Sequence, residues 1–288
     1  MTNGKRYKLI ALDLDGTLLH ADGTPCPRAT QAITMVQAAG YRVCIATGRN
    51  YTESRAIIRA AGIKDECVFV GGAVVVDTRT ETTLHRTIMH PDLAAEACAL
   101  FESMGYAALA LQDTCEAGLD YLITRDLPVS PATTNWIASM KMGVDYVPQL
   151  GSYAHRHTLR VSICCDLEQE KTIVPILQQR FGNRTMMHSL RVPGMNCQVV
   201  EIFDPAVNKW EGINYIARRH GIAPEEVIAV GDDMNDLHMI RHAGLGVAMG
   251  NSRPELKAIA RRVIGANSQG GLGLFLEELA DGRSGAAA

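Results

Sequence analysis

The chain has 288 residues, of which 47% are hydrophobic and 20% charged, so it can bury a sizeable core and is not a disordered chain. Its 28 Lys and Arg stand against 31 Asp and Glu, without the basic surplus that binding to a nucleic-acid backbone uses. No apolar run reaches the roughly 20 residues that span a bilayer, and the start, MTNGKRYKLIALDLDG, reaches acidic residues too soon for a secretory signal. We therefore expect a cytoplasmic protein with no nucleic-acid and no membrane partner. The length favours two domains, or one domain with an insertion.

Strands and helices are predicted to alternate at the start of the chain. KLIALDL predicts a buried strand, and PRATQAITMVQAAG predicts a helix that begins near Pro27 and ends at Gly40. YRVCIAT and ESRAIIRAAG repeat this order, and CVFV, Gly71-Gly72 and AVVVD predict a third strand followed by a tight turn. Apolar strands alternating with helices are typical of a parallel sheet that is covered on both faces.

The pattern changes between about residues 84 and 192, where strands and helices are mixed without phosphate-loop signatures. After CQVVEIF the first pattern returns, with helix NKWEGINYIARRHG, strand EEVIAVGDD and helix NDLHMIRHAG, and LGVAMG and PELKAIARRVIG predict a last strand and helix. The sequence thus predicts an α/β protein with a Rossmann-like parallel-sheet core, formed by residues 1–83 and 193–288. An α+β domain is inserted at residues 84–192.

Two acidic clusters follow predicted strands. Asp13 and Asp15 lie in DLDGTLL, and Asp232, Asp233 and Asp236 lie in GDDMND. In open parallel sheets, ligands collect at the carboxyl ends of the strands, so we expect both clusters at one edge. Two carboxylates about 5 Å apart repel by roughly 3 kcal/mol at an effective dielectric constant near 20. A bound cation relieves this repulsion, and oxygen ligands of this kind favour Mg²⁺.

Two further motifs supply groups that suit a phosphate. ATGRN offers the Thr47 hydroxyl and the Gly48 amide where a helix is predicted to begin. Lys209 offers a point charge at the start of another predicted helix. Together with the acids, these groups indicate phosphoryl chemistry with a carboxylate nucleophile, a second carboxyl group and a cation.

DLDGTLL, TGR, a lone Lys at a helix start and GDDMND, in this order, resemble the motifs of the haloacid dehalogenase-like hydrolases. The long insertion between the second and third motifs resembles the Cof-like phosphatases, the branch with a C2-type cap. The resemblance covers nearly the whole chain. It implies that Asp13 is the nucleophile and that Asp15 is the general acid and base.

The resemblance also assigns the binding groups. It implies that Thr47, Gly48, Lys209 and Asn235 hold the phosphate. It implies a Mg²⁺ site that involves Asp13, Asp15 and Asp232. The supporting residues are Asp233, Asp236 and Arg49, and Asp236 is expected to orient Lys209 or water rather than to bind the metal.

The chain departs from the resemblance at two places. Relatives commonly have Asn-Gly-Ala where this chain has Gly71-Gly72-Ala73, and Ser-Lys-Gly where it has Asn208-Lys209-Trp210. The first departure removes a polar side chain, and the second places a bulky ring beside the lysine. Both weaken any inference about the substrate, and neither affects the catalytic assignments.

Together, the motifs and the resemblance predict a Mg²⁺-dependent hydrolase of small phosphorylated metabolites. Sugar phosphates are the expected class of substrate. Asp13 would form an aspartyl phosphate, and Asp15 would protonate the leaving oxygen and activate water. A phosphomutase of the same fold stays open as an alternative, and so does a phospho-accepting signalling or binding module, although such modules need no insertion of this size. No pattern in the sequence indicates an oligomeric state.

Three other features receive a structural interpretation. His155-Arg156-His157 is expected at the surface, and the eight cysteines are expected to be reduced. Gly244-Leu245-Gly246 with Gly250 follows a predicted helix and opens a strand, which is the wrong context for a dinucleotide site.

Overall fold

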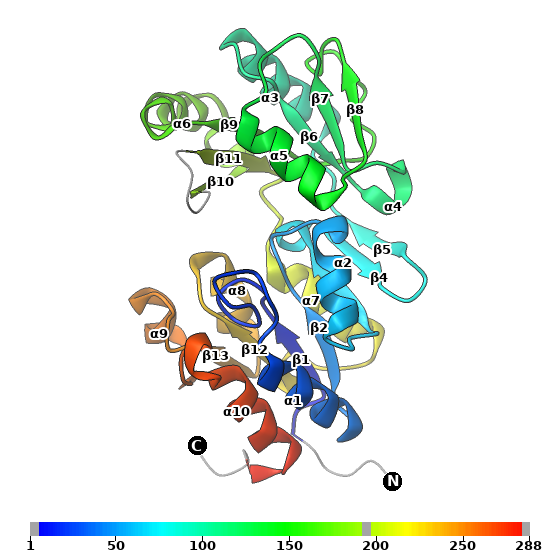
Figure 1. Cartoon of the computed structure of the whole chain (residues 1–288), viewed down its shortest axis with the longest axis vertical. Coiled ribbons are helices and arrows are strands. Elements are labelled where there is room, and N and C mark those ends of the chain that lie inside the picture. Colours follow the sequence, from blue (N-terminus) through cyan, green and yellow to red (C-terminus); the bar gives the residue numbers. More distant parts are fainter. Residues whose placement is uncertain (1–5, 192–196, 284–288) are drawn as a thin grey trace. The chain divides into compact units, whose positions relative to one another are not determined.

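The computed structural model describes residues 6–191 and 197–283 (Figure 1). The chain forms two compact units. The first unit runs up to His85 and resumes at Asn208, and the second consists of Arg86–Val207. Among the described residues, none of the helices combines the length and the apolar character that crossing a membrane would require.

A five-stranded sheet with the order β14-β13-β12-β1-β2 forms the centre of the first unit. All of its neighbouring strands are parallel, which confirms the predicted parallel-sheet core. In β1 every residue is buried, because both faces of the strand are covered. The strands are β1 (Leu9–Leu12), β2 (Arg42–Ile45), β12 (Val227–Gly231), β13 (Leu245–Ala248) and β14 (Arg262–Val263).

Helices follow these strands as the sequence predicts, with one difference at the end. Helix α9 ends at Ile259, and Arg262–Val263 pairs with β13 as a short strand, so PELKAIARRVIG is not one helix. Helix α1 packs against α10, and its buried residues are Ala29, Ala32, Ile33 and Val36. The helices of this unit are α1 (Pro27–Ala38), α2 (Tyr51–Ala60), α7 (Lys209–Arg219), α8 (Leu237–His242), α9 (Pro254–Ile259) and α10 (Gly271–Ala280).

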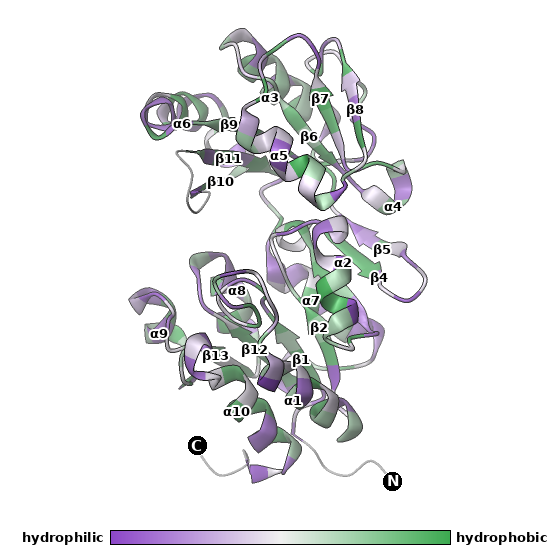
Figure 2. Cartoon of the chain, in the orientation of Figure 1, coloured by the Kyte–Doolittle hydropathy of each residue, from purple (hydrophilic) through white to green (hydrophobic). Residues whose placement is uncertain are grey.

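A second, three-stranded sheet in the first unit has the order β3-β4-β5. It consists of β3 (Glu66–Phe69), β4 (Val74–Asp77) and β5 (Thr82–Arg86). Strands β3 and β4 are antiparallel, and a single parallel bridge between Ala46 and Val68 connects β3 to the chain just after β2. Figure 2 shows the apolar character of β4 and the polar character of β5.

The second unit is built on a six-stranded sheet with the order β10-β11-β9-β6-β7-β8. Its strand pairs are antiparallel except for β7 and β8, which are parallel. The strands are β6 (Leu109–Gln112), β7 (Tyr121–Thr124), β8 (Val144–Val147), β9 (Thr158–Cys165), β10 (Met186–Arg191) and β11 (Gln198–Phe203). The helices are α3 (Pro91–Ser103), α4 (Thr114–Ala117), α5 (Pro131–Met140) and α6 (Leu167–Phe181).

The two faces of this sheet have different neighbours. Val161 and Ile163 of β9 belong to a buried apolar cluster that also contains residues of α3 and α6. Tyr121 of β7 points the other way, and its ring meets the ring of Trp136 in α5 with the centroids 5.6 Å apart. The period of two along a strand explains this division.

Two details differ from the sequence-based expectation. The inserted domain was expected to end at residue 192, whereas β11 pairs with β9 and β10 and so belongs to the sheet of the second unit. An apolar run such as CQVVEIF does not reveal which sheet it joins. The surface position expected for His155 is wrong. Its ring is fully buried, with Nδ1 3.0 Å from the Thr158 hydroxyl and Nε2 2.8 Å from the Leu150 carbonyl oxygen.

Short 3-10 helices occupy several turns of both units. One of them, Met234–Asp236, lies in the acidic motif after β12 and precedes α8. The others are Val70–Gly72, Gly182–Arg184, Pro224–Glu226 and Asn267–Gln269.

Candidate active site

A buried lysine holds two aspartates at the carboxyl ends of β1 and β12. Lys209 is the first residue of α7, where Asn208 caps the helix by accepting a hydrogen bond from the Glu211 N–H. Its Nζ donates to Oδ1 of Asp13 and to Oδ1 of Asp236, both at 2.6 Å. Asp13 follows β1 directly, and its backbone N–H donates to the Val230 carbonyl. The predicted nucleophile and the predicted phosphate-binding lysine are therefore in direct contact.

Burial dominates the electrostatics of these groups. The Lys209 side chain is 1% exposed, and those of Asp13 and Asp236 are 7% and 0% exposed. Burial raises the pKa of Asp13 well above its ordinary value; the Lys209 charge opposes this shift and Asp236 adds to it. For Lys209, burial lowers the pKa, but the charges of Asp13 and Asp236 raise it by more. The lysine is therefore a permanent cation between two acids.

Asp236 uses both of its carboxylate oxygens inside the protein. Oδ1 accepts from Lys209, and Oδ2 accepts from the backbone N–H groups of Asp232 (2.8 Å) and Asp233 (3.1 Å). A Cβ on Gly231 would lie 2.4 Å from Cγ of Asp236, so this approach requires glycine there. Asp236 thus connects Lys209 to the start of the loop formed by residues 232–236.

Asp232 is the acid at this edge that best complements Asp13 as a metal ligand. Oxygen atoms of Asp13, Asp232 and Asp236 lie within 4.8 Å of one another, and those of Asp236 are already engaged. Burial and the Asp236 charge raise the pKa of Asp232 to about 6, as expected for a carboxylate crowded by other acids. A divalent cation between Asp13 and Asp232 would relieve this crowding, so the donor set fits Mg²⁺.

Residues that the sequence analysis did not single out orient Asp232. The Thr17 hydroxyl donates to Oδ1 at 3.2 Å, and Nδ2 of Asn251 lies 3.3 Å from Oδ2. Gly16 has φ +75°, and a Cβ there would lie 2.1 Å from Oδ2, so any other residue would displace the Asp232 carboxylate. Asn251 follows β13, and its place after a strand of the parallel sheet is a signal that could have identified it.

The Asp15 carboxylate does not belong to the acidic cluster. Both of its oxygens accept from the Arg49 guanidinium, Oδ2 from Nε at 2.8 Å and Oδ1 from Nη2 at 2.5 Å. The Asp15 side chain is 58% exposed, whereas that of Arg49 is 24% exposed. Thus, of the acids expected at the metal, the structure groups the carboxylates of Asp13 and Asp232 and holds the carboxylate of Asp15 on Arg49.

The loop that carries Thr47, Gly48 and Arg49 lies next to the loop formed by residues 232–236. Thr47 is fully buried, its N–H donates to the Val68 carbonyl, and its hydroxyl accepts from the Arg49 N–H at 3.2 Å. A Cβ on Gly48 would lie 3.9 Å from Nδ2 of Asn235, so these two predicted phosphate-binding positions are neighbours.

Asp233 lies farther from the chemistry. Its carboxylate accepts from the Met234 N–H and from Nε of Arg253. The first contact caps the short Met234–Asp236 helix and the second is an exposed ion pair, so we assign Asp233 a structural role.

The two departures from the related motifs have physical explanations. Gly72 is the glycine that this chain shares with the related Asn-Gly-Ala motif: a Cβ there, where φ is +113°, would lie 2.0 Å from the carbonyl oxygen of Asn208, so it lets the chain pass close to the start of α7. Gly71 has φ +65° with open space around it, a conformation that asparagine also tolerates. The Trp210 ring is buried against His242 of α8, with the ring centroids 5.8 Å apart.

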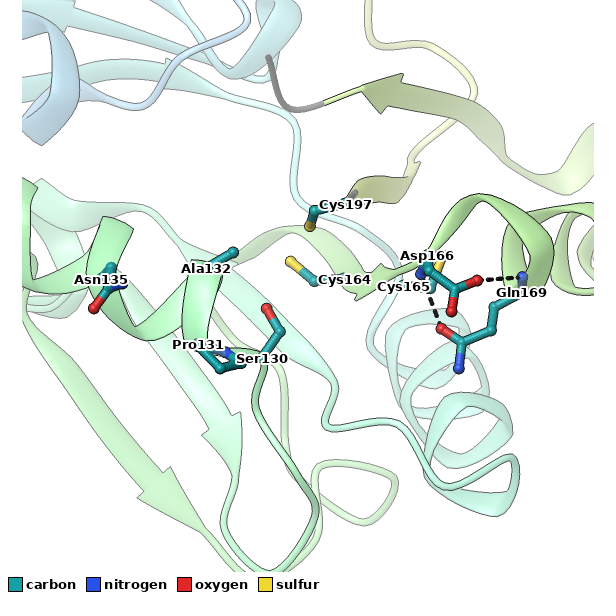
Figure 3. Close-up of a pocket in the computed structure, with 9 residues that line it drawn as sticks. All are labelled: Ser130, Pro131, Ala132, Asn135, Cys164, Cys165, Asp166, Gln169 and Cys197. Atoms are coloured by element: carbon teal, nitrogen blue, oxygen red, sulfur yellow. Dashed lines mark hydrogen bonds between the residues drawn. The ribbon is translucent and has the colours of Figure 1, made fainter. Parts of the chain in front are cut away.

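A pocket of about 420 Å³ in the second unit has a different character (Figure 3). The thiols of Cys164 and Cys197 point toward each other in it, and burial raises the pKa of Cys164 to about 12. The acid among its nine described lining residues is Asp166, which accepts from the N–H groups of Glu168 and Gln169 as the cap of α6. We therefore place the catalytic chemistry in the first unit.

Comparisons with known proteins identify the family of the chain. A family model for haloacid dehalogenase-like hydrolases matches residues 10–276. A 5-amino-6-(5-phospho-D-ribitylamino)uracil phosphatase from Bacillus subtilis is 28% identical over 94% of this chain and 96% of its own. A pyridoxal phosphate phosphatase from Escherichia coli is 27% identical over 93% of this chain and 97% of its own. The crystal structure of a haloacid dehalogenase-like hydrolase from Bacteroides thetaiotaomicron has a TM-score of 0.79 at 21% identity, covering 95% of this chain and 99% of its own.

Proposed function

Because the chain belongs to the haloacid dehalogenase-like hydrolases and is a phosphatase of that family, we propose that it hydrolyses small phosphorylated metabolites through an aspartyl phosphate on Asp13. The observation that carries this proposal is the buried contact of Lys209 with both Asp13 and Asp236. It gives a carboxylate at a strand end a fixed direction and a permanent cation beside it. In-line attack on phosphorus needs both.

The reaction then divides between two acids. Asp13 attacks phosphorus, and the proton on Asp15 passes to the leaving oxygen, which departs as an alcohol. Asp15 next removes a proton from the water that attacks the aspartyl phosphate, which releases inorganic phosphate and restores Asp13. Lys209, Thr47 and the loop amides hold the phosphoryl oxygens during both steps.

The site also suits Mg²⁺, which the carboxylates of Asp13 and Asp232 would hold. The observation behind this assignment is that carboxylate oxygens of Asp13, Asp232 and Asp236 lie within 4.8 Å of one another; burial and the Asp236 charge accordingly raise the pKa of Asp232 to about 6. When bound, the cation neutralises charge on the transferring phosphoryl group. Thr17 and Asn251 would keep Asp232 in place for this role.

The class of substrate is drawn from the relatives. Their names place a phosphorylated ribitylaminouracil and pyridoxal phosphate among the compounds that they dephosphorylate. Both are small phosphomonoesters, so we assign this chain to the same class. The choice of sugar phosphates within the class rests on the resemblance to the Cof-like phosphatases and is part of the proposal.

A screen of about a hundred phosphorylated metabolites for released phosphate, with Mg²⁺ present, tests the proposal. We expect several phosphomonoesters to be hydrolysed by the natural chain and none by the Asp13→Asn variant. Isomerised sugar phosphate without phosphate release, detected by nuclear magnetic resonance, would indicate a phosphomutase instead. Equal phosphate release by both proteins would show that Asp13 is not the nucleophile.

A further inference from the structure

The pair formed by Asp15 and Arg49 conflicts with the task of Asp15. A carboxylate whose two oxygens both accept from one guanidinium has no oxygen ready to carry a proton to a leaving group. Asp15 is also the more exposed partner, at 58% against 24%. If Asp15 is the general acid and base, the described arrangement is a resting one, and this ion pair opens before the reaction.

Arg49 is placed to have a second partner. Its N–H donates to the Thr47 hydroxyl, and its carbonyl accepts from the Val70 N–H, so the backbone is fixed in the loop that carries the phosphate-binding Thr47 and Gly48. Its guanidinium is partly exposed and can turn about the side-chain bonds. Lys209, by contrast, is buried with its Nζ fixed between two carboxylates, so it meets the phosphoryl group without changing its position.

We propose that Arg49 is an exchange residue, which holds Asp15 in the resting enzyme and passes to the phosphoryl oxygens of the incoming substrate. The inference rests on the proposed function of the site. A phosphate dianion at the same distance attracts the guanidinium with twice the Coulomb energy of a carboxylate, and guanidinium binds phosphate in the same two-pronged geometry. Arrival of the phosphoryl group therefore frees Asp15 at the moment when its proton transfer is required.

The first test measures binding without turnover. We expect isothermal titration of the protein with inorganic phosphate, in the presence of Mg²⁺, to show about tenfold weaker binding for Arg49→Ala, the usual effect of losing one hydrogen bond to a charged group. The phosphate affinity of Arg49→Lys should lie between those of the natural chain and Arg49→Ala, because lysine keeps the positive charge but cannot form the two-pronged contact.

Arg28→Ala is the matched control for this test. Arg28 of α1 makes the same two-pronged contact with Glu277 of α10, at 2.8 and 2.7 Å. Its removal should leave phosphate binding unchanged, and both alanine variants should keep the natural circular dichroism spectrum. Unchanged phosphate binding in a folded Arg49→Ala protein would overturn the exchange.

The second test observes the exchange directly. Crystals grown with tungstate, a phosphate analogue, should show the Arg49 guanidinium on the oxyanion and the Asp15 carboxylate released from it. A bound oxyanion with the Asp15–Arg49 pair intact would overturn the proposal, whatever the binding constants are.

Kinetics separate exchange from a fixed positioning role. If Arg49 exchanges partners, Arg49→Ala raises KM by about tenfold. The ratio between the kcat values for an alkyl phosphate and for p-nitrophenyl phosphate stays the same as in the natural chain, because Asp15 is free in both proteins once substrate is bound. A selective fall of kcat with the alkyl phosphate would mean that Arg49 positions Asp15 during proton transfer and would contradict exchange. A third result is that the natural chain hydrolyses no ester but binds phosphate more tightly than Arg49→Ala does. This result would contradict the proposed function and would still support the exchange of partners by Arg49.

Discussion

Nζ of Lys209 lies 2.6 Å from Oδ1 of Asp13 across a separation of 196 residues in the sequence. The contact joins the first strand of the sheet to a helix that follows the whole second unit. Because both groups are buried, their charges interact in a medium of low polarity and neither side chain can turn away into solvent. The orientation of the Asp13 carboxylate is therefore set by the second half of the core.

Replacement of Asp13 and replacement of Asp15 should have different effects on turnover and on the aspartyl phosphate. Asp13→Asn removes the nucleophile and should abolish turnover and any covalent phosphate. Asp15→Asn should lower kcat by roughly 10²- to 10⁴-fold with alkyl phosphates, and by less with p-nitrophenyl phosphate, whose leaving group needs little protonation. Rapid quench should trap phosphorylated Asp13 in the Asp15 variant. A trapped intermediate in Asp13→Asn, with none in Asp15→Asn, would reverse the two assignments.

Asp232→Ala should weaken the binding of Mg²⁺ while the protein stays folded, because the change removes one of several mutually repelling carboxylates and no apolar packing. Titration of activity with Mg²⁺ and a melting curve measure the two effects. Asp233→Ala is the matched control, since the Asp233 carboxylate is paired with Arg253, and its Mg²⁺ dependence should be natural. Ca²⁺ should inhibit, because its larger and looser ligand shell misplaces the nucleophile. If the activity of Asp232→Ala depended on Mg²⁺ as that of the natural chain does, Asp232 would not be a metal ligand.

Gly72→Ala and Gly71→Ala should differ in their effect on stability. Both glycines have positive φ, so each change costs about 1–2 kcal/mol in backbone strain. At Gly72 the new methyl group would also collide with the Asn208 carbonyl oxygen, 2.0 Å away, and would displace the start of α7. We expect a clearly larger loss of denaturation free energy, together with lost activity, for Gly72→Ala. Equal losses would show that the close approach is unimportant.

The sequence was sufficient for the parts of the structure that depend on local pattern. Buried strands such as Leu9–Leu12 were predictable because both of their faces are covered, and the rule that ligands gather at strand ends placed Asp13 and Asp232 at one edge. The pairing of Asp15 with Arg49 was not predictable, because 34 residues separate them and no periodicity links them. The membership of β11 in the second sheet and the burial of His155 likewise depend on tertiary pairing.

Glu66 should make a pH-dependent contribution to stability. Burial raises its pKa, but hydrogen bonds from the backbone and from His220, together with the Arg42 charge, lower it to a net value below 4.5. A folded-state pKa that is depressed gives stability that is present above the unfolded-state value of 4.5 and is lost as the pH falls through the folded-state value. Glu66→Gln should therefore reduce the free energy of unfolding at pH 7 by about 1–2 kcal/mol. Melting curves should show this gap closing in acid, and a gap independent of pH would contradict the assignment.

Limited proteolysis should cut first at the expected borders of the inserted domain. Residues Arg79, Thr80 and Glu81 form an exposed turn between β4 and β5, so trypsin should cleave near residues 80–86. The second expected region, 191–196, lies mostly outside the described residues. Mass spectrometry of the early fragments identifies the sites. Early cleavage near Ile10 or Val230, inside the central sheet, would contradict the proposed domain division.

The central position of β1 affects how the protein is made. Strand β1 pairs with β2 on one side and with β12 on the other, so its second partner leaves the ribosome about 180 residues after the first. At ordinary rates of synthesis this delay is roughly 10–40 s, during which one edge of an entirely apolar strand has no partner. Closing that edge brings Asp232 and Asp236 to Asp13 and Lys209 in the same event. The acidic cluster of Asp13, Asp232 and Asp236 therefore cannot assemble around Lys209 until residue 236 has left the ribosome.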